Sequence, residues 1–245
     1  MAGQLGNFFL LFLALFLTLH KTRPFWAGVA LMPFALKPHL FLPFALVLLA
    51  WVLARRVWGI AAGFAAAIAA SSALALWFDP QVWLHYRQMM AQTGVLNAFV
   101  PALSVALRFA VAPNHVWVQF VPELAACAWA LWFLRRRQDT WDWATDGMLV
   151  LLVSSVCAAY GWFSDEPVLF PALLAAVYAA QSRRSLIPLA VAATAALAEV
   201  LSGVQMNTSW FLWTTPAWLL SYLFAVRGTA LGDLRGVQTD ATGSK

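Results

Sequence analysis

The chain has 245 residues, of which 63% are hydrophobic and 10% charged, and its formal net charge is +5. A water-soluble domain carries roughly 45–50% apolar and about 25% charged residues, so this composition excludes a soluble globular protein and indicates an integral membrane protein. The basic residues form short clusters between apolar runs instead of one patch or tail, which excludes nucleic acid as a partner.

Nine apolar runs in chain order predict membrane-spanning helices, so we expect an all-α, polytopic membrane protein. Some runs are shorter than the ~20 residues of a perpendicular span, which neighbouring helices make tolerable. The first run lacks a basic leader and a small-residue cleavage site, which favours a span over a signal peptide. The predicted spans are residues 5–20, 24–36, 40–54, 57–78, 115–134, 143–161, 167–181, 185–204 and 211–226.

The segment 79–114 is predicted to be one long outer loop that lies on the membrane or re-enters it. Residues 94–112 are apolar enough for a tenth span, but a tenth span would move the arginines at 135–137 to the outer side. The first part of the loop carries apolar side chains at helical spacing with polar residues between them, which predicts an interfacial amphipathic helix. These apolar residues are Val82, Trp83, Tyr86, Met89 and Met90.

The distribution of Lys and Arg predicts the orientation in the membrane. If sides alternate along the nine spans, twelve of the 15 basic residues are cytoplasmic and only Lys37, Arg87 and Arg108 lie outside. We therefore expect a transmembrane domain over residues 1–227 of a bacterial-type inner (plasma) membrane, with the amino terminus outside. Residues 228–245 are polar and Gly/Thr-rich, which predicts a disordered cytoplasmic tail.

Lys37-Pro38-His39 is the most informative polar segment, because a lysine between two short apolar runs on the outer side departs from the charge bias. Lys37 either binds a phosphate as a point charge, with a hydrogen bond from His39, or extends its ammonium to the membrane surface. The residues alone leave both interpretations open.

Carboxylates provide the second set of candidates. Asp165 and Glu166 are adjacent, so either their repulsion raises one pKa, as a general acid requires, or they form a solvated turn before Pro167. Glu123 and Glu199 lie within apolar spans, where acids are functional candidates, although neither has an evident partner in the sequence.

Other kinds of chemistry lack support in the sequence. His85 and His115 have no ligand spacing with any cysteine or carboxylate, so we predict no metal site. Cys127 and Cys157 lie inside apolar runs and are interpreted as small buried hydrophobes. Phosphate-binding loops, dinucleotide fingerprints and nucleophile elbows are absent from the sequence, so no cofactor is predicted and no catalytic residue is assigned.

The order of several short motifs resembles the carboxy-terminal half of glycosyltransferase family 87, whose members are GT-C type membrane enzymes. The similarity covers most of residues 3–200, and each motif is short. In order, these are Gly3-Gln4 with Asn7, Ala27-Gly28, Leu36-Lys37-Pro38-His39, Arg55-Arg56, Trp83 with Tyr86, Asn97, Arg108, and Tyr160-Gly161-Trp162-Phe163-Ser164-Asp165 before Leu169 and Pro171.

The resemblance implies a GT-C-like fold and transfer of a hexose, often mannose, from a polyprenyl-phosphate carrier to an acceptor on the extracytoplasmic face. It implies that Lys37 and His39 bind the donor phosphate or line its pocket. Tyr86, Arg87 and the loop around Asn97 would border the groove for the lipid carrier. Asp165 would contribute to the donor or acceptor site.

The sequence departs from the GT-C pattern in one respect. These enzymes carry an essential acidic residue in the first outer loop, which acts as general base on the acceptor hydroxyl. Nothing in this chain matches that segment, so we expect a fragment, a split gene product or a diverged remnant that works with an amino-terminal half or a partner subunit.

Two other classes of function remain open at this stage. A transporter or flippase for a lipid-linked solute would move its substrate without forming a covalent product. A non-catalytic subunit of a membrane complex would co-purify with the partner that carries the activity.

Overall fold

The computed structural model describes residues 5–92, 99–205 and 208–226, and this part of the chain consists of helices and turns with no strand. The predicted all-α class is confirmed. Residues 214–226 form the last described helix, here called the terminal helix. The other elements are α1 (Leu5–Leu19), α2 (Pro24–Ala30), η1 (Met32–Leu36), α3 (Pro38–Arg55), α4 (Trp58–Phe78), α5 (Val82–Gln92), α6 (Leu103–Val111), η3 (Val116–Phe120), α7 (Val121–Arg137), α8 (Asp146–Cys157), η4 (Phe163–Leu169), α9 (Phe170–Ala179), η5 (Arg183–Leu186), α10 (Ile187–Leu201) and η6 (Ser209–Phe211).

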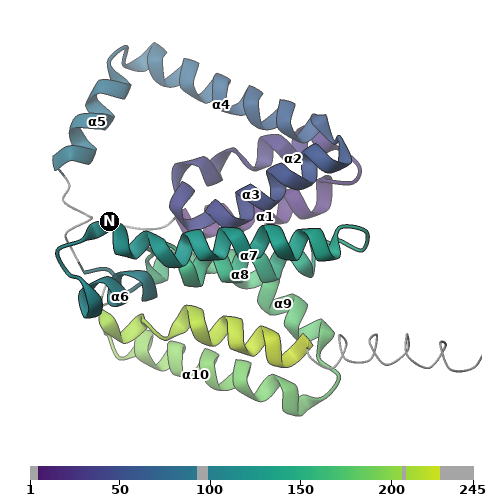
Figure 1. Ribbon diagram of the computed structural model, residues 1–245, viewed down its shortest axis with the longest axis vertical. Helices are drawn as coiled ribbons and strands as arrows, with labels where there is room; N and C mark the ends of the chain where they lie inside the picture. The colour runs from purple at the N-terminus through teal and green to yellow at the C-terminus, as the bar shows by residue number, and fades with distance from the viewer. Residues whose placement is uncertain (1–4, 93–98, 206–207, 227–245) are drawn as a thin grey trace, which may run out of the picture.

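The helices form a layered bundle (Figure 1). One layer contains α1, α2 and α3, and α3 packs against α7 and α8 in the middle of the molecule. The chain then passes through α9 to α10, which lies with the terminal helix along the lower edge in Figure 1. On the opposite edge α4 runs along the bundle, and α5 leads back from its far end.

Each of the nine predicted apolar runs coincides with a helical segment. Within the described residues, four helical segments are long and apolar enough to cross a membrane, which supports the membrane-protein class. They are Pro38–Arg55, Trp58–Phe78, Val116–Arg137 and Arg183–Leu201. Nine crossings remain a prediction.

The outer loop predicted over 79–114 contains two described helices. The predicted amphipathic helix is present as α5. Helix α6 has 9 residues, and at 1.5 Å per residue it rises only about 13 Å, well short of the ~30 Å hydrocarbon core. Residues 93–98, including Asn97, lie outside the described part, and the placement of this loop in the membrane stays a prediction.

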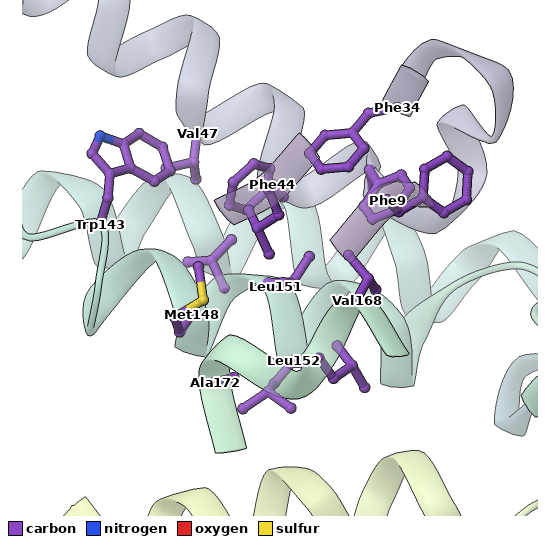
Figure 2. Packing of buried hydrophobic residues seen from close by; sticks show 14 of the residues in the cluster. Phe9, Phe34, Phe44, Val47, Trp143, Met148, Leu151, Leu152, Val168 and Ala172 are labelled. Carbon is purple, nitrogen blue, oxygen red and sulfur yellow. The ribbon is translucent and has the colours of Figure 1, made fainter. Parts of the chain in front are cut away.

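The core is built mainly from aromatic and branched side chains of α1, η1, α3 and α8 (Figure 2). Phe34 stacks on Phe41 with ring centroids 4.3 Å apart, and Trp143 packs edge-on against Phe16. Large apolar side chains also face outward, with Phe78 at 80% exposure. An apolar surface of this kind suits contact with lipid.

Helices α2 and α4 cross in backbone contact because both carry glycine at the crossing. A Cβ atom on Gly28 would lie 2.0 Å from the carbonyl oxygen of Ile60, and one on Gly63 would lie 1.9 Å from that of Phe25. Small residues let membrane helices approach closely and gain van der Waals contact. The Ala27-Gly28 motif therefore serves this crossing.

The bundle has two polar ends of different character. At one end, here called the arginine end, the turns at 20–23, 55–57 and 138–143 meet, and the Arg55 guanidinium donates to the Gln138 carbonyl oxygen. At the other, here called the lysine end, the segments 37–39 and 160–166 meet. This grouping agrees with the predicted alternation of sides, while the face that is cytoplasmic stays a prediction.

Candidate functional site

The centre of the candidate site is an ion pair between Lys37 and Asp165. Lys37 Nζ lies 2.7 Å from Asp165 Oδ1 and 2.8 Å from Oδ2, so the ammonium bridges both carboxylate oxygens. The Asp165 side chain is 3% exposed and that of Lys37 is 18% exposed. Asp165 is therefore not a solvated turn residue, and Lys37 does not extend freely to the surface.

Local structure explains how these two residues meet. Lys37 occupies the junction at which η1 ends and α3 begins, and Pro38 follows at the first helical position, where its missing N–H costs no hydrogen bond. Asp165 lies in the first turn of η4, and its Oδ2 accepts a hydrogen bond from the Trp162 amide at 3.3 Å. That bond fixes the carboxylate at the start of η4.

Helix α1 holds η4 in this position. A Cβ atom on Gly6 would lie 2.2 Å from the Ser164 carbonyl oxygen, so only glycine allows α1 to pack so closely on the turn before Asp165. The glycine thus acts on the site through the position of the backbone.

His39 lies beside the ion pair and stacks on a second aromatic ring. Its imidazole and the Tyr160 phenol have centroids 3.6 Å apart and an interplanar angle of 21°. Stacking fixes the imidazole plane at the lysine end. The structure therefore brings together Lys37, His39 and Asp165 from the predicted set.

Glu166 faces away from Lys37 toward the terminal helix. Its Oε2 accepts a hydrogen bond from Trp218 Nε1 at 2.7 Å, and its Oε1 is hydrogen-bonded to Thr214 Oγ1. Burial raises the pKa of Glu166 from 4.5 to about 7, and the Asp165 charge adds to this rise while the two hydrogen bonds oppose it. Of the two interpretations that the sequence left open, this geometry favours a raised pKa of one acid, with burial and not repulsion as the larger cause.

Thr214 and Trp218 were not identified as site residues from the sequence. They lie four residues apart, on one face of an apolar helix. Two polar donors at this spacing are a signal that a buried acceptor faces the helix.

A small cavity of about 20 Å³ lies between Asp165, Glu166 and the start of α3, with Leu40, Ser155 and Thr215 in its wall. This volume has room for one water molecule. Ser155 Oγ is enclosed and has no hydrogen-bond partner among the described residues. The wall therefore offers carboxylate and hydroxyl oxygens to a small polar guest.

Tyr86 and Arg87 lie on the exposed surface of α5. The Tyr86 phenol lies near Tyr160 of the lysine end. The turn before α5 is held by Asp79, whose carboxylate lies 2.7 Å from His85 Nδ1 and accepts the Gln81 amide at 2.9 Å. These hydrogen bonds lower the pKa of Asp79, with that from His85 the larger cause.

The other polar residues noted in the sequence are buried or hydrogen-bonded within the fold. Arg108 is 1% exposed, and its Nη1 donates to Gln119 Oε1 at 2.9 Å. Glu199 accepts a hydrogen bond from Trp213 Nε1 at 3.1 Å, and Glu123 is 2% exposed within α7. The tail at 228–245 lies outside the described residues.

A long apolar groove begins next to Lys37. It has a volume of about 420 Å³ and is lined by apolar side chains of η1, α3 and α4. Ala35 and Pro38, which flank Lys37 in the chain, line one part, and Leu49 and Val52 near the other end of α3 line another. The groove therefore follows most of the length of α3.

The long apolar helices and the buried ion pair at one end define the class: a polytopic helical membrane protein with a polar site at one end of its bundle. Residues 1–155, well over half of the chain, match the family model of glycosyltransferase family 87. The chain therefore belongs to glycosyltransferase family 87. No curated protein and no solved structure matches the chain.

The family match includes some of the candidate residues and not others. Lys37, His39, Tyr86 and Arg87 lie within residues 1–155, whereas Asp165 lies beyond them. The carboxylate that pairs with Lys37 is thus a contribution of the part of this chain that follows the match.

Proposed function

We propose that this protein transfers a hexose, with mannose as the first candidate, from a polyprenyl-phosphate carrier to an acceptor at the lysine end. Membership of glycosyltransferase family 87 supports a membrane glycosyltransferase. The observation that carries the assignment to this end is the buried contact of Lys37 with Asp165, beside the His39–Tyr160 stack. The positive-inside pattern supports an extracytoplasmic location for this end, in the inner membrane.

The apolar groove along α3 suits the carrier lipid. A polyprenyl phosphate has a long apolar chain and one anionic head. The groove along α3 offers the chain an apolar wall, and Lys37, whose neighbours Ala35 and Pro38 line the groove, is the point charge for the phosphate. Burial of the chain supplies affinity, and the head group determines which end of the groove the sugar occupies.

In the transfer, the bond from the sugar carbon to the phosphate oxygen breaks, a bond to the acceptor oxygen forms, and the acceptor hydroxyl gives its proton to the departing phosphate. Negative charge develops on the departing phosphate. Lys37, held in a largely buried site, stabilises that charge more strongly than a solvated cation does. Asp165 holds the ammonium in place before the donor arrives.

The test is sugar transfer in membranes that contain the full protein, with a radiolabelled polyprenyl-phosphate mannose as donor. Lys37→Ala is expected to lower the rate by roughly 10²-fold, the usual effect of removing one charge-stabilising donor. Lys21→Ala is the matched control, because Lys21 is an exposed lysine at the arginine end, and its rate should be unchanged. Full activity of Lys37→Ala would contradict the proposal.

A second variant separates a functional role from a structural one. Exchanging the two charges, Lys37→Asp with Asp165→Lys, restores an ion pair between the same two positions. We expect this variant to recover stability without recovering transfer, because the cation then stands on η4. Movement of the label across the membrane with no covalent product would instead indicate a transporter.

A further inference from the structure

Thr214 contacts two oxygen atoms near Glu166, but its hydroxyl has only one hydrogen to donate. Thr214 Oγ1 contacts Glu166 Oε1 and lies 2.8 Å from the carbonyl oxygen of Phe211. A hydroxyl group has one hydrogen to donate, and a carbonyl oxygen can only accept. Both contacts are satisfied when a second proton resides on the Glu166 carboxyl.

With that proton the chain of donors is complete. The Glu166 hydroxyl donates to Thr214 Oγ1, Thr214 donates to the Phe211 carbonyl, and Trp218 Nε1–H donates to Glu166 Oε2 at 2.7 Å. An ionised Glu166 would compete with Phe211 for the single Thr214 hydrogen. Loss of one of two contacts in an enclosed site is costly, because the acceptor cannot turn to water.

We propose that Glu166 is a neutral carboxylic acid in the native protein and a positioning residue for the site, because it fastens the terminal helix to η4, the turn that presents Asp165 to Lys37. Asp165 and Glu166 then divide the roles of carboxylate and acid. The effect of Glu166 on the stability of the protein is independent of the proposed function. Only its role in positioning the site for catalysis rests on that function.

The charged and titratable neighbours support the assignment. On η4 itself, Asp165 faces Glu166 as a negative charge and opposes its ionisation. Lys37 does not offset this, because its ammonium is engaged by both oxygens of Asp165. From the packed elements, Glu199 of α10 is held by Trp213, and α1 presents no titratable side chain over Leu5–Leu19.

Groups on the other packed elements complete the surroundings. Tyr222 is the titratable side chain of the described terminal helix, four residues beyond Trp218, and its hydroxyl donates to the Thr145 carbonyl oxygen at 2.8 Å. Cys157 ends α8 as a free thiol. Helix α8 also carries Asp146, and α9, which packs on η4 as well, carries Tyr178. None of these groups supplies a positive charge that would favour the ionised form of Glu166.

The direction of the pH effect follows from the raised pKa of Glu166. In the unfolded chain the carboxyl loses its proton near 4.5, and in the folded protein near 7. Between these values the folded state binds more protons, so stability falls as pH rises. The contribution is fully present below about 4.5 and is lost as pH passes about 7.

The experiment compares thermal unfolding of the full protein in detergent at pH 5 and pH 8 for the wild type, Glu166→Gln and Glu166→Ala. Gln has the same shape, donates to Thr214 and accepts from Trp218, but does not titrate. We expect the wild-type Tm to fall by roughly 5 °C more than that of Glu166→Gln between the two pH values. Glu166→Gln should match the wild type at pH 5, and Glu166→Ala should lie below both.

Two outcomes would overturn the proposal. One is a Tm for Glu166→Gln at pH 5 that is as low as that of Glu166→Ala. The other is the same fall between pH 5 and pH 8 in the wild type and Glu166→Gln.

None of these readouts uses sugar transfer, so failure of this inference and failure of the proposed function are distinguishable. Where transfer is active, its pH profile adds a test of positioning. The wild-type rate should decline above pH 7 relative to Glu166→Gln, and parallel profiles would limit Glu166 to a structural role.

Discussion

Asp165 and Glu166 are neighbours in the chain, yet they lie in different electrostatic surroundings. Asp165 points to the Lys37 ammonium, whereas Glu166 points to a hydroxyl and an indole of the terminal helix. The Lys37 ammonium pairs with the carboxylate of Asp165, and burial raises the pKa of Glu166. The hydrogen-bond and charge partners of each carboxyl therefore determine its role in the site.

Removal of one member of the ion pair should be strongly destabilising. We expect Lys37→Met to cost about 3 kcal/mol, because it leaves the Asp165 carboxylate buried and unpaired. Asp165 is 3% exposed, so water cannot replace the ammonium without local opening. The measurement is the free energy of unfolding in detergent. A cost below ~0.5 kcal/mol would mean that the pair is worth no more than a surface one.

The double variant Lys37→Met with Asp165→Leu serves as its control. A buried ion pair replaced by apolar side chains often leaves stability unchanged or improved. We therefore expect this variant to unfold near the wild-type temperature and to have no transfer activity. An active double variant would show that neither charge is needed for the reaction.

At the scale of elements, the positions of α1, η4 and α2 depend on close backbone contacts. Gly6 sets the distance between α1 and η4, and Gly28 with Gly63 sets that between α2 and α4. Because α2 leads through η1 to Lys37, and η4 carries Asp165, the small residues determine where both charges lie.

Gly28→Ala tests the close contact between α2 and α4. Its Cβ would lie 2.0 Å from the Ile60 carbonyl oxygen, so the two helices must separate, and we expect a loss of about 2 kcal/mol from overpacking. Gly161→Ala is the matched control, since its Cβ would meet Leu40 Cδ1 at an ordinary 3.6 Å. Equal unfolding temperatures for the two variants would show that the α2–α4 crossing tolerates added volume.

Local patterns predicted the elements well. The apolar spacing of 82–90 predicted α5, and Lys37-Pro38 marked the boundary between η1 and α3. The contact of Lys37 with Asp165, which are 128 positions apart, depends on the packing of α1 and η4. No local pattern carries that information. The sequence therefore suggested two unrelated features: a lysine that binds phosphate or reaches the surface, and a pair of adjacent acids.

At the scale of the whole molecule, the turns group into two ends that match the predicted sides. The arginine end gathers the turns at 20–23, 55–57 and 138–143, and the lysine end gathers 37–39 and 160–166. Sequence charge predicted this division through the positive-inside rule alone. The structure adds that the turns of each end are in contact.

Sidedness can be measured by labelling single introduced cysteines in a background that lacks Cys127 and Cys157. We expect Gln88→Cys, on the exposed surface of α5, to react with an impermeant maleimide in intact cells. Gln138→Cys, at the arginine end, should react only after the membrane is opened. The reverse pattern would place the lysine end in the cytoplasm and contradict the predicted orientation.

The most direct test of a donor site at the lysine end is photo-crosslinking in native membranes. The probe is a polyprenyl phosphate that carries a photoreactive group on its prenyl chain. We predict labels on exposed side chains of the α3–α4 groove, such as Leu49 and Phe64, that unlabelled polyprenyl phosphate displaces and that Lys37→Met weakens. Labels spread over outward-facing side chains such as Phe78, with no displacement, would contradict a donor site at the lysine end.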